Sequence, residues 1–279
     1  KLEGCSMQEL VTRDGDEATC ESRDKAACLA VLAASGTGST PLTVTTCATA
    51  TTAASCTELL GNAPIAACAT KPGELAANAP CGYSSQCQSA YCAVIKGALC
   101  GTCAPLPKAG DSCASIGCGP ALRCSKSLIC SSFATLDQPC DSEQTCDYGL
   151  GCVQAKGEAQ GACKPLVASE GAACDAKEQT APSCDRKAGL WCLGTGTCAK
   201  GAGYAKAGEA CGVLDPTTFK SCTSGSCLSP EGKTGTCAAA ATEGGACNTS
   251  SGSGCVTGLR CVVSTEAGAG TCMSQATCK

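Results

Sequence analysis

The sequence contains no histidine and very few aromatic residues. Its 279 residues include two Phe, four Tyr and one Trp. The absence of His excludes a Cys2His2 zinc site, a His-ligated haem and a Ser-His-Asp triad. So few aromatic side chains cannot fill the interior of one globular domain of this length, because they supply much of the buried area in ordinary cores. Something other than a conventional hydrophobic core must hold the chain together.

Long apolar runs and clusters of basic residues are also missing. The longest uncharged apolar run covers residues 26–34, about half the length needed to cross a bilayer. The net charge is −4, without a basic patch. We therefore expect no transmembrane segment and no nucleic-acid partner. No signal peptide is visible, so in a secreted protein we expect Lys1 to lie close to the processed terminus.

Cysteine is the residue that the sequence has in excess, with 32 copies. Such a content is typical of disulfide scaffolds in oxidising compartments, and it predicts an extracellular or cell-surface protein. A metal-thiolate protein is disfavoured because the only closely spaced pair is Cys100-Gly-Thr-Cys103. That pair lacks the strand-to-helix context of a redox motif, so we interpret it as structural. We expect no metal, no cofactor and no catalytic residue.

From Cys81 onward the cysteines repeat in groups of four. Each group opens on a leader of small residues ending in Cys, and later members often follow Gly-Leu-x or Gly-Thr. The repeat predicts six modules. They are module 1 (78–104; Cys81, Cys87, Cys92, Cys103), module 2 (105–131; Cys113, Cys118, Cys124, Cys130), module 3 (132–164; Cys140, Cys146, Cys152, Cys163), module 4 (165–199; Cys174, Cys184, Cys192, Cys198), module 5 (200–238; Cys211, Cys222, Cys227, Cys237) and module 6 with the C-terminal tail (239–279; Cys247, Cys255, Cys261, Cys272).

Each module is predicted to form a short β-hairpin stapled to a loop. Turn-rich stretches with glycine lie between the third and fourth cysteines. Four cysteines allow three pairings, and we favour first-to-third with second-to-fourth, which ties the leader and the loop to opposite strands. Trp191 in module 4 either covers its own disulfide or forms an exposed contact.

These units, with their Gly-Leu-x-Cys and Gly-Thr-Cys patterns, resemble the tandem Dickkopf-type and EGF-like cysteine-rich repeats of predicted secreted proteins from myxobacteria and related bacteria. The resemblance covers roughly residues 78–279. It implies an extracellular array rather than an activity. The units have four cysteines rather than the six of EGF domains, and they lack the acidic calcium signature, so calcium dependence is not implied.

Residues 1–77 follow a different pattern, with widely spaced cysteines and an Ala/Thr/Leu-rich composition. Capping signals at Ser6, Asp16 and Thr40-Pro41 predict three helical pieces, the second covering 17–34 and the third running towards Gly61. Three disulfides are expected among Cys5, Cys20, Cys28, Cys47, Cys56 and Cys68. The predicted fold is therefore small and disulfide-rich: an α-helical, disulfide-bonded head domain (1–77) followed by an elongated array of six mini-modules with short β-hairpins.

Charge is distributed unevenly within this head domain. Residues 29–70 carry a single charged side chain, Glu58. This half of the domain is either an interface or a buried helix pair.

Two cysteines, Cys100 and Cys278, remain outside the pattern. In an extended rod they would lie near opposite ends, too far apart for a disulfide within one chain. We therefore predict a bond from Cys278 of one subunit to Cys100 of the next, which would make a head-to-tail filament covalent. The alternatives are an array that folds back so that the two pair internally, or a wrongly assigned module.

Two functions fit the sequence, and neither is enzymatic. The first is a structural subunit of an extracellular, disulfide-stabilised fibre or surface appendage, in which the protein's partner is itself. The second is a secreted or surface-displayed binding or adhesion protein, whose inter-cysteine loops recognise a cell-surface protein or glycan.

Overall fold

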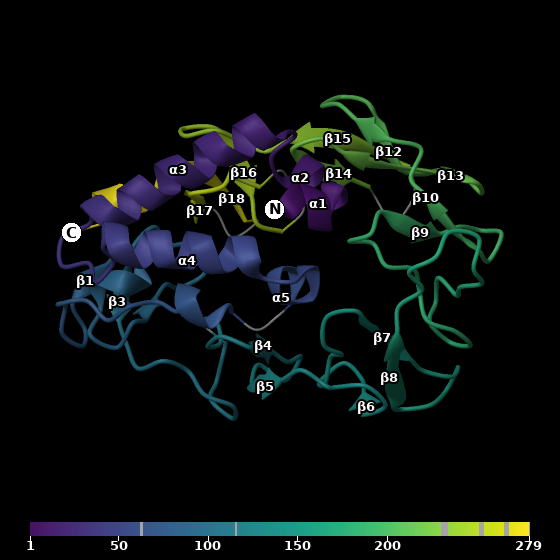
Figure 1. Cartoon of the computed structure of the whole chain (residues 1–279), viewed down its shortest axis with the longest axis horizontal. Coiled ribbons are helices and arrows are strands. Elements are labelled where there is room, and N and C mark those ends of the chain that lie inside the picture. Colours follow the sequence, from purple (N-terminus) through teal and green to yellow (C-terminus); the bar gives the residue numbers. More distant parts are fainter. Residues whose placement is uncertain (62–63, 115, 230–233, 251–253, 265–267, 279) are drawn as a thin grey trace.

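The six modules follow one another around a ring, and the helices of the N-terminal region lie across its interior (Figure 1). The computed structural model describes residues 1–61, 64–114, 116–229, 234–250, 254–264 and 268–278. The disulfide Cys100–Cys278 closes the ring by joining module 1 to the segment after module 6. The helical head and the disulfide-bonded hairpin modules are confirmed. The elongated course predicted for the array is wrong, because the modules bend around the helices and make contacts with them.

Helix caps divide the helical region, residues 1–77, into short segments. As predicted, the side chains of Ser6 and Asp16 accept hydrogen bonds from backbone N–H groups at the starts of the second and third helices. The helix predicted from Pro41 towards Gly61 is split, because Ser55 and Glu58 form a capping box that starts a new helix. The elements are α1 (Leu2–Cys5), α2 (Met7–Arg13), α3 (Glu17–Ala33), α4 (Pro41–Ala53), α5 (Cys56–Leu60) and the 3-10 helix η1 (Ala66–Cys68).

The modules form small, mostly antiparallel sheets. Module 1 contains β1 (Pro80–Cys81), η2 (Ser84–Gln86), β2 (Cys92–Ala93) and β3 (Gly101–Cys103); module 2, β4 (Leu122–Cys124) and β5 (Cys130–Ser132); module 3, β6 (Pro139–Cys140), β7 (Leu150–Val153) and β8 (Gly161–Pro165). Module 4 contains β9 (Leu190–Cys192) and β10 (Cys198–Lys200); module 5, β11 (Tyr204–Ala205), β12 (Ala210–Asp215), β13 (Thr218–Cys222), β14 (Gly225–Leu228) and β15 (Gly235–Ala239); module 6, β16 (Ala246–Asn248), β17 (Leu259–Val263) and β18 (Ala269–Ser274), followed by η4 (Gln275–Thr277). Parts of the hairpins predicted between Cys227 and Cys237 and between Cys261 and Cys272, residues 230–233 and 265–267, lie outside the described residues, as does Lys279 of the predicted tail.

One backbone geometry recurs in every leader. The residue three positions before the first cysteine has φ between 62° and 93°. Gly, Asn and Asp adopt this left-handed conformation most readily. Its N–H donates to the carbonyl of the fourth cysteine at 2.7–2.9 Å, and the N–H of that cysteine donates back to the next leader residue. The six residues are Asn78, Gly110, Asp137, Gly171, Gly208 and Gly244.

A second recurring contact joins the segment before the first cysteine to the second cysteine of the same module. In five modules, a residue six or seven positions before the first cysteine pairs in parallel with the second cysteine. The pairs are Leu75 with Cys87, Ala134 with Cys146, Val167 with Cys184, Ala205 with Cys222 and Ala241 with Cys255. The connecting segments are therefore strand-like parts of the modules that they precede.

Disulfide sulfurs take the place of aliphatic side chains in the module cores. In module 1, for example, Cys81, Cys87, Cys92 and Cys103 form a buried cluster, against which only Leu75 and Val94 pack. The clusters in modules 3, 4 and 5 each bury three cysteines and one aliphatic residue, Ala134, Leu190 and Ala205 respectively, with the fourth cysteine packed against them. The shortage of aromatic residues is thus compensated by covalent bonds rather than by packing area.

The helical region is bonded to several modules. The contacts include Gln86 of module 1 with the carbonyl of Ser35, Lys187 of module 4 with the carbonyl of Leu60, and Ser224 of module 5 with the carbonyl of Val11. Among the described residues, no helix is long and apolar enough to cross a bilayer.

Asp14 is the charged centre of this interface. Its fully buried carboxylate accepts hydrogen bonds from Arg13 Nε at 2.5 Å, Arg23 Nη1 at 3.2 Å and Thr257 Oγ1 of module 6 at 3.4 Å. Burial acts to raise the pKa of Asp14, but the two arginines outweigh it and hold the pKa below its ordinary value. The carboxylate thus stays ionised where the helices meet the ring.

Trp191 joins two modules. Its ring stacks on Phe219 of module 5 with centroids 3.5 Å apart, and Arg186 lies 5.1 Å from its centroid. The ring is half-buried and its Nε1 is buried, so the exposed-contact interpretation is wrong.

Candidate functional site

The predicted disulfide pattern is confirmed in all six modules. In each one, the first cysteine bonds to the third and the second to the fourth, with Cα atoms 5.4–6.0 Å apart. Several module cysteines bring three sulfurs within 4.8 Å of one another. These sulfurs are bonded in disulfides, so they offer no thiolate that a metal ion would need.

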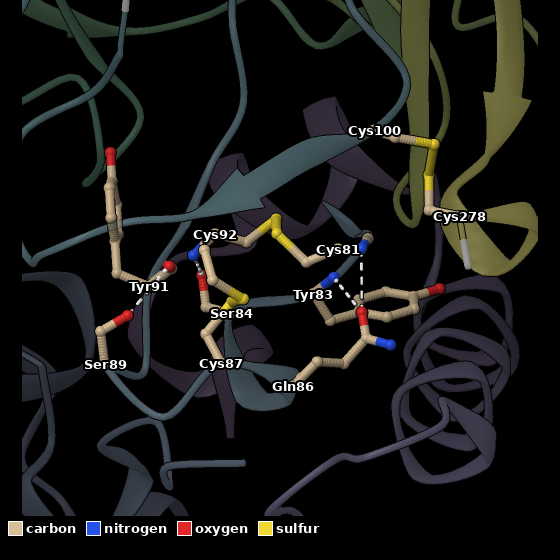
Figure 2. The surroundings of a disulfide bond; sticks show 12 residues. Cys81, Tyr83, Ser84, Gln86, Cys87, Ser89, Tyr91, Cys92, Cys100 and Cys278 are labelled. Atoms are coloured by element: carbon tan, nitrogen blue, oxygen red, sulfur yellow. Dashed lines mark hydrogen bonds between the residues drawn. A yellow bond between two sulfur atoms is a disulfide. The ribbon is translucent and has the colours of Figure 1, made fainter. Parts of the chain in front are cut away.

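The bond predicted between subunits forms within the chain. Cys100 and Cys278 are bonded, with Cα atoms 5.4 Å apart. Figure 2 places this bond beside the Cys81–Cys92 bond of module 1. The prediction of an intersubunit Cys278–Cys100 link is wrong because it assumed a straight rod, whereas the ring brings the two ends together. The alternative of an array folded back on itself is the one observed.

Polar contacts from module 6 surround the closing bond. Arg260 Nη1 donates to the carbonyl of Leu99 at 3.1 Å, and Val263 N–H donates to the carbonyl of Gly97 at 2.9 Å. Burial lowers the pKa of Arg260. A Cβ on Gly82 would come within 2.6 Å of the carbonyl oxygen of Gln275, so the close approach of η4 requires glycine there.

A buried glutamine joins the same part of module 1 to the helical region. Gln86 Oε1 accepts hydrogen bonds from the N–H groups of Gly82 and Tyr83 at 2.8 and 3.0 Å (Figure 2). Its Nε2 donates to the carbonyl of Ser35. Gly82, which lies against η4 beside the closing bond, is therefore hydrogen-bonded to the same glutamine that holds Ser35 of the helical region.

The helical region has two disulfides rather than the predicted three. Cys5 bonds to Cys56, and Cys47 bonds to Cys68. Cys20 and Cys28 are free thiols. The prediction that these two are half-cystines is therefore wrong. They lie eight residues apart on the continuous helix α3, a rise of about 12 Å, which is too far for a bond between them.

One hollow lies between the helical region and module 3. It has a volume of about 770 Å³, against about 390–490 Å³ for four other hollows. We call it the α4–module 3 groove. Its walls are Ala50, Ala53 and Ala54 from the end of α4, Thr57 and Glu58 of α5, Gly61, Pro64 and Ile65, Ala66 and Ala67 of η1, and Asp147 and Tyr148 of module 3.

Small and apolar side chains form the floor of the groove, and two carboxylates are its charged groups. The described lining contains no basic side chain. Glu58 Oε2 accepts hydrogen bonds from the N–H and the hydroxyl of Ser55, both at 2.8 Å, which lowers the pKa of Glu58. Asp147 Oδ1 accepts from the N–H of Tyr148 at 2.7 Å. The groove therefore combines an apolar surface with negative charge.

Tyr148 is held against the helices by a lysine. Lys187 Nζ lies 4.7 Å from the Tyr148 ring centroid and donates to the carbonyl of Leu60 at 2.7 Å. This one ammonium group connects module 4, module 3 and the end of α5. Burial raises the pKa of Tyr148, so its hydroxyl stays protonated at neutral pH.

For residues 29–70, which include α4, the sequence left two alternatives, an interface or a buried helix pair. The helix α4 contains no buried residue, and its Leu42 is 75% exposed. The interpretation as a buried helix pair does not describe it. Its C-terminal end lines the groove, and Thr43, Val44 and Cys47 line a second hollow on the side of α3 and η1.

Sequence patterns did not identify the groove residues. Tyr148 and Asp147 lie in a loop of module 3, and nothing in their local sequence indicates that the array bends to bring them to α5. The sequence did show that residues 29–70 have a single charged side chain, and ten of the twelve described lining residues of the groove lie in this range.

Comparisons of the chain with protein-family models, with curated proteins and with solved structures found no match.

Proposed function

We propose that this is a secreted or surface-displayed binding protein that holds an extended protein segment in the α4–module 3 groove. The observation that carries the proposal is a hollow of about 770 Å³ that combines small apolar lining residues with the carboxylates of Glu58 and Asp147. Small residues on the floor leave space for side chains of a bound segment, and the carboxylates favour a Lys or Arg side chain.

The compartment follows from the thirty bonded cysteines, since such a framework persists only in oxidising surroundings. The resemblance to tandem Dickkopf-type and EGF-like repeats of secreted bacterial proteins is consistent with an extracellular display scaffold. In this proposal the protein acts by binding, without chemistry, and the ring holds the groove walls in a fixed geometry.

The test selects peptides from a phage-displayed library of random linear sequences on the immobilised, oxidised protein. We expect enrichment of peptides that place Lys or Arg beside small apolar residues. Tyr148→Ala should weaken a selected peptide about tenfold, the effect of losing an aromatic contact of about 1.4 kcal/mol. Tyr204→Ala is the matched control, because Tyr204 is an exposed tyrosine of module 5, which does not line the groove.

A second variant tests the charge. Glu58→Gln retains the cap of α5 but removes the carboxylate, so it should weaken the peptide and reduce the salt dependence of its affinity. Selected peptides without basic residues, or an affinity unchanged by both Tyr148→Ala and Glu58→Gln, would contradict the proposal.

A fibre subunit is the second candidate, and the exposed, uncharged surface of α4 with Leu42 favours it. Its assembly would have to be non-covalent at the ring closure, because Cys100 and Cys278 are bonded to each other. Electron microscopy of native material separates the candidates: long regular filaments favour the fibre, and dispersed particles favour the binding protein.

A further inference from the structure

Two free thiols flank one disulfide of the helical region. Cys28 lines a hollow of about 390 Å³ together with Cys47 and Cys68, which are bonded to each other. Cys20 lines a second hollow, of about 490 Å³, together with Thr51. The Thr51 hydroxyl lies 3.5 Å from Cys68 Sγ and 3.9 Å from Cys47 Sγ. Cys28 thus shares a hollow with the bonded pair, whereas Cys20 lines a different hollow and reaches the pair only through Thr51.

The two thiols have different surroundings. Cys20 Sγ accepts a hydrogen bond from Arg13 Nη2 at 2.9 Å and lies 3.7 Å from a carboxylate oxygen of Asp24. It is therefore held in the polar cluster at the start of α3, and burial raises the pKa of its thiol. Cys28 lines the same hollow as Cys47 and Cys68. Cys28 is the thiol placed to react.

We propose that Cys28 and the Cys47–Cys68 bond form a thiol–disulfide exchange site. The Cys28 thiolate attacks Cys47 Sγ, a Cys28–Cys47 bond forms, and the Cys47–Cys68 bond breaks. Cys68 leaves with the bonding electron pair and takes up the proton that Cys28 released. One disulfide and one thiol are present before and after, so the step needs no oxidant or reductant.

The position of Thr51 selects the leaving group. Its hydroxyl is closer to Cys68 Sγ than to Cys47 Sγ, and it can donate a hydrogen bond to a departing Cys68 thiolate. In the product, a bond from α3 to α4 replaces the bond from α4 to η1.

Exchange would also change the groove. Ala67 of η1 lines both the α4–module 3 groove and the hollow of Cys28. Releasing Cys68 frees η1 from α4 and loosens one wall of the groove. This consequence rests on the proposed function, whereas the exchange itself does not.

The test follows the bonds in the full, oxidised protein. Samples held at a series of pH values are quenched with acid, where thiols are protonated, and digested with pepsin. Pepsin cleaves at leucines, and Leu42 and Leu59 separate the cysteines concerned. After alkylation at low pH, mass spectrometry identifies the linked peptides. We expect a Cys28–Cys47 peptide together with alkylated Cys68, formed faster at the higher pH values of the series because a thiolate is the attacking species.

Cys28→Ser should abolish the new linkage, and Cys20→Ser, its matched control on the same helix, should retain it. Blocking the thiols with N-ethylmaleimide before the pH change gives the same answer without a variant. Finding only Cys47–Cys68 at every pH, or finding the rearranged peptides equally in the blocked protein, would overturn the proposal. Peptide binding to the groove is measured separately, so failure of exchange leaves that result unaffected.

Discussion

Removal of the ring-closing bond should cost more stability than removal of the local bond Cys47–Cys68. Cys100 and Cys278 are 178 residues apart in sequence, and the chain-entropy model gives about 5 kcal/mol for a loop of that length. The other disulfides shorten the path between the two cysteines in the unfolded chain. The cost varies with the logarithm of loop length, so even halving the path lowers the figure by only about 0.6 kcal/mol. For Cys47–Cys68, separated by 21 residues, the same model gives about 3.3 kcal/mol.

The assay compares guanidinium unfolding of the double variants Cys100→Ser/Cys278→Ser and Cys47→Ser/Cys68→Ser with that of the wild type, without reductant. Double substitution avoids leaving an unpaired thiol. We expect midpoints that fall in both variants, and further in the ring-opened one. The hydrogen bonds of Arg260 and Gln86 remain in that variant, so the folded ring should persist under native conditions. A loss below about 1 kcal/mol on opening the ring would refute the reasoning that the bond restricts a long unfolded loop.

Three further predictions concern single residues. Asp14→Asn should lower the free energy of unfolding by about 2 kcal/mol at neutral pH. The pKa of Asp14 is lowered in the folded state, so the extra free energy of unfolding of the wild type is complete above the ordinary Asp pKa of about 4. It disappears as pH falls through the lower pKa of the folded state. Unfolding curves at several pH values will measure this dependence. Phe219→Ala should shift the emission of Trp191, the single tryptophan, to longer wavelength, since the stacked ring that shields it is removed; an unchanged spectrum would argue against the stack. Gly208→Val should destabilise module 5 by about 1–2 kcal/mol, because φ is +86° there, whereas Gly208→Asn should be tolerated far better; thermal unfolding distinguishes the two.

The modules could be predicted from sequence because their structure is local. The bonds within a module span 11 to 18 residues, and each leader carries its own left-handed residue before the first cysteine. The spacing of the cysteines therefore contains most of the information about their pairing. The helix starts at Ser6, Asp16 and Thr40 were predictable for the same reason, since a cap acts within one turn.

The path of the whole array was not predictable in this way. It depends on contacts between distant segments, such as Asp14 with Thr257 and Arg260 with Leu99. None of these residues stands out in sequence. The free thiols were missed for a related reason: counting cysteines assumed that all six of the helical region pair, whereas the straight course of α3 keeps Cys20 and Cys28 apart. The groove could not be predicted from the sequence for the same reason, because Tyr148 lies near α5 only when the array bends into a ring.

The ring closure also constrains the order in which the molecule matures. Cys278 follows all six modules in the chain, so its bond to Cys100 can form only after the last module has been synthesised. The helices, which lie inside the ring, emerge first. The modules can therefore dock on the helices as they are synthesised, and the Cys100–Cys278 bond then closes the ring around them.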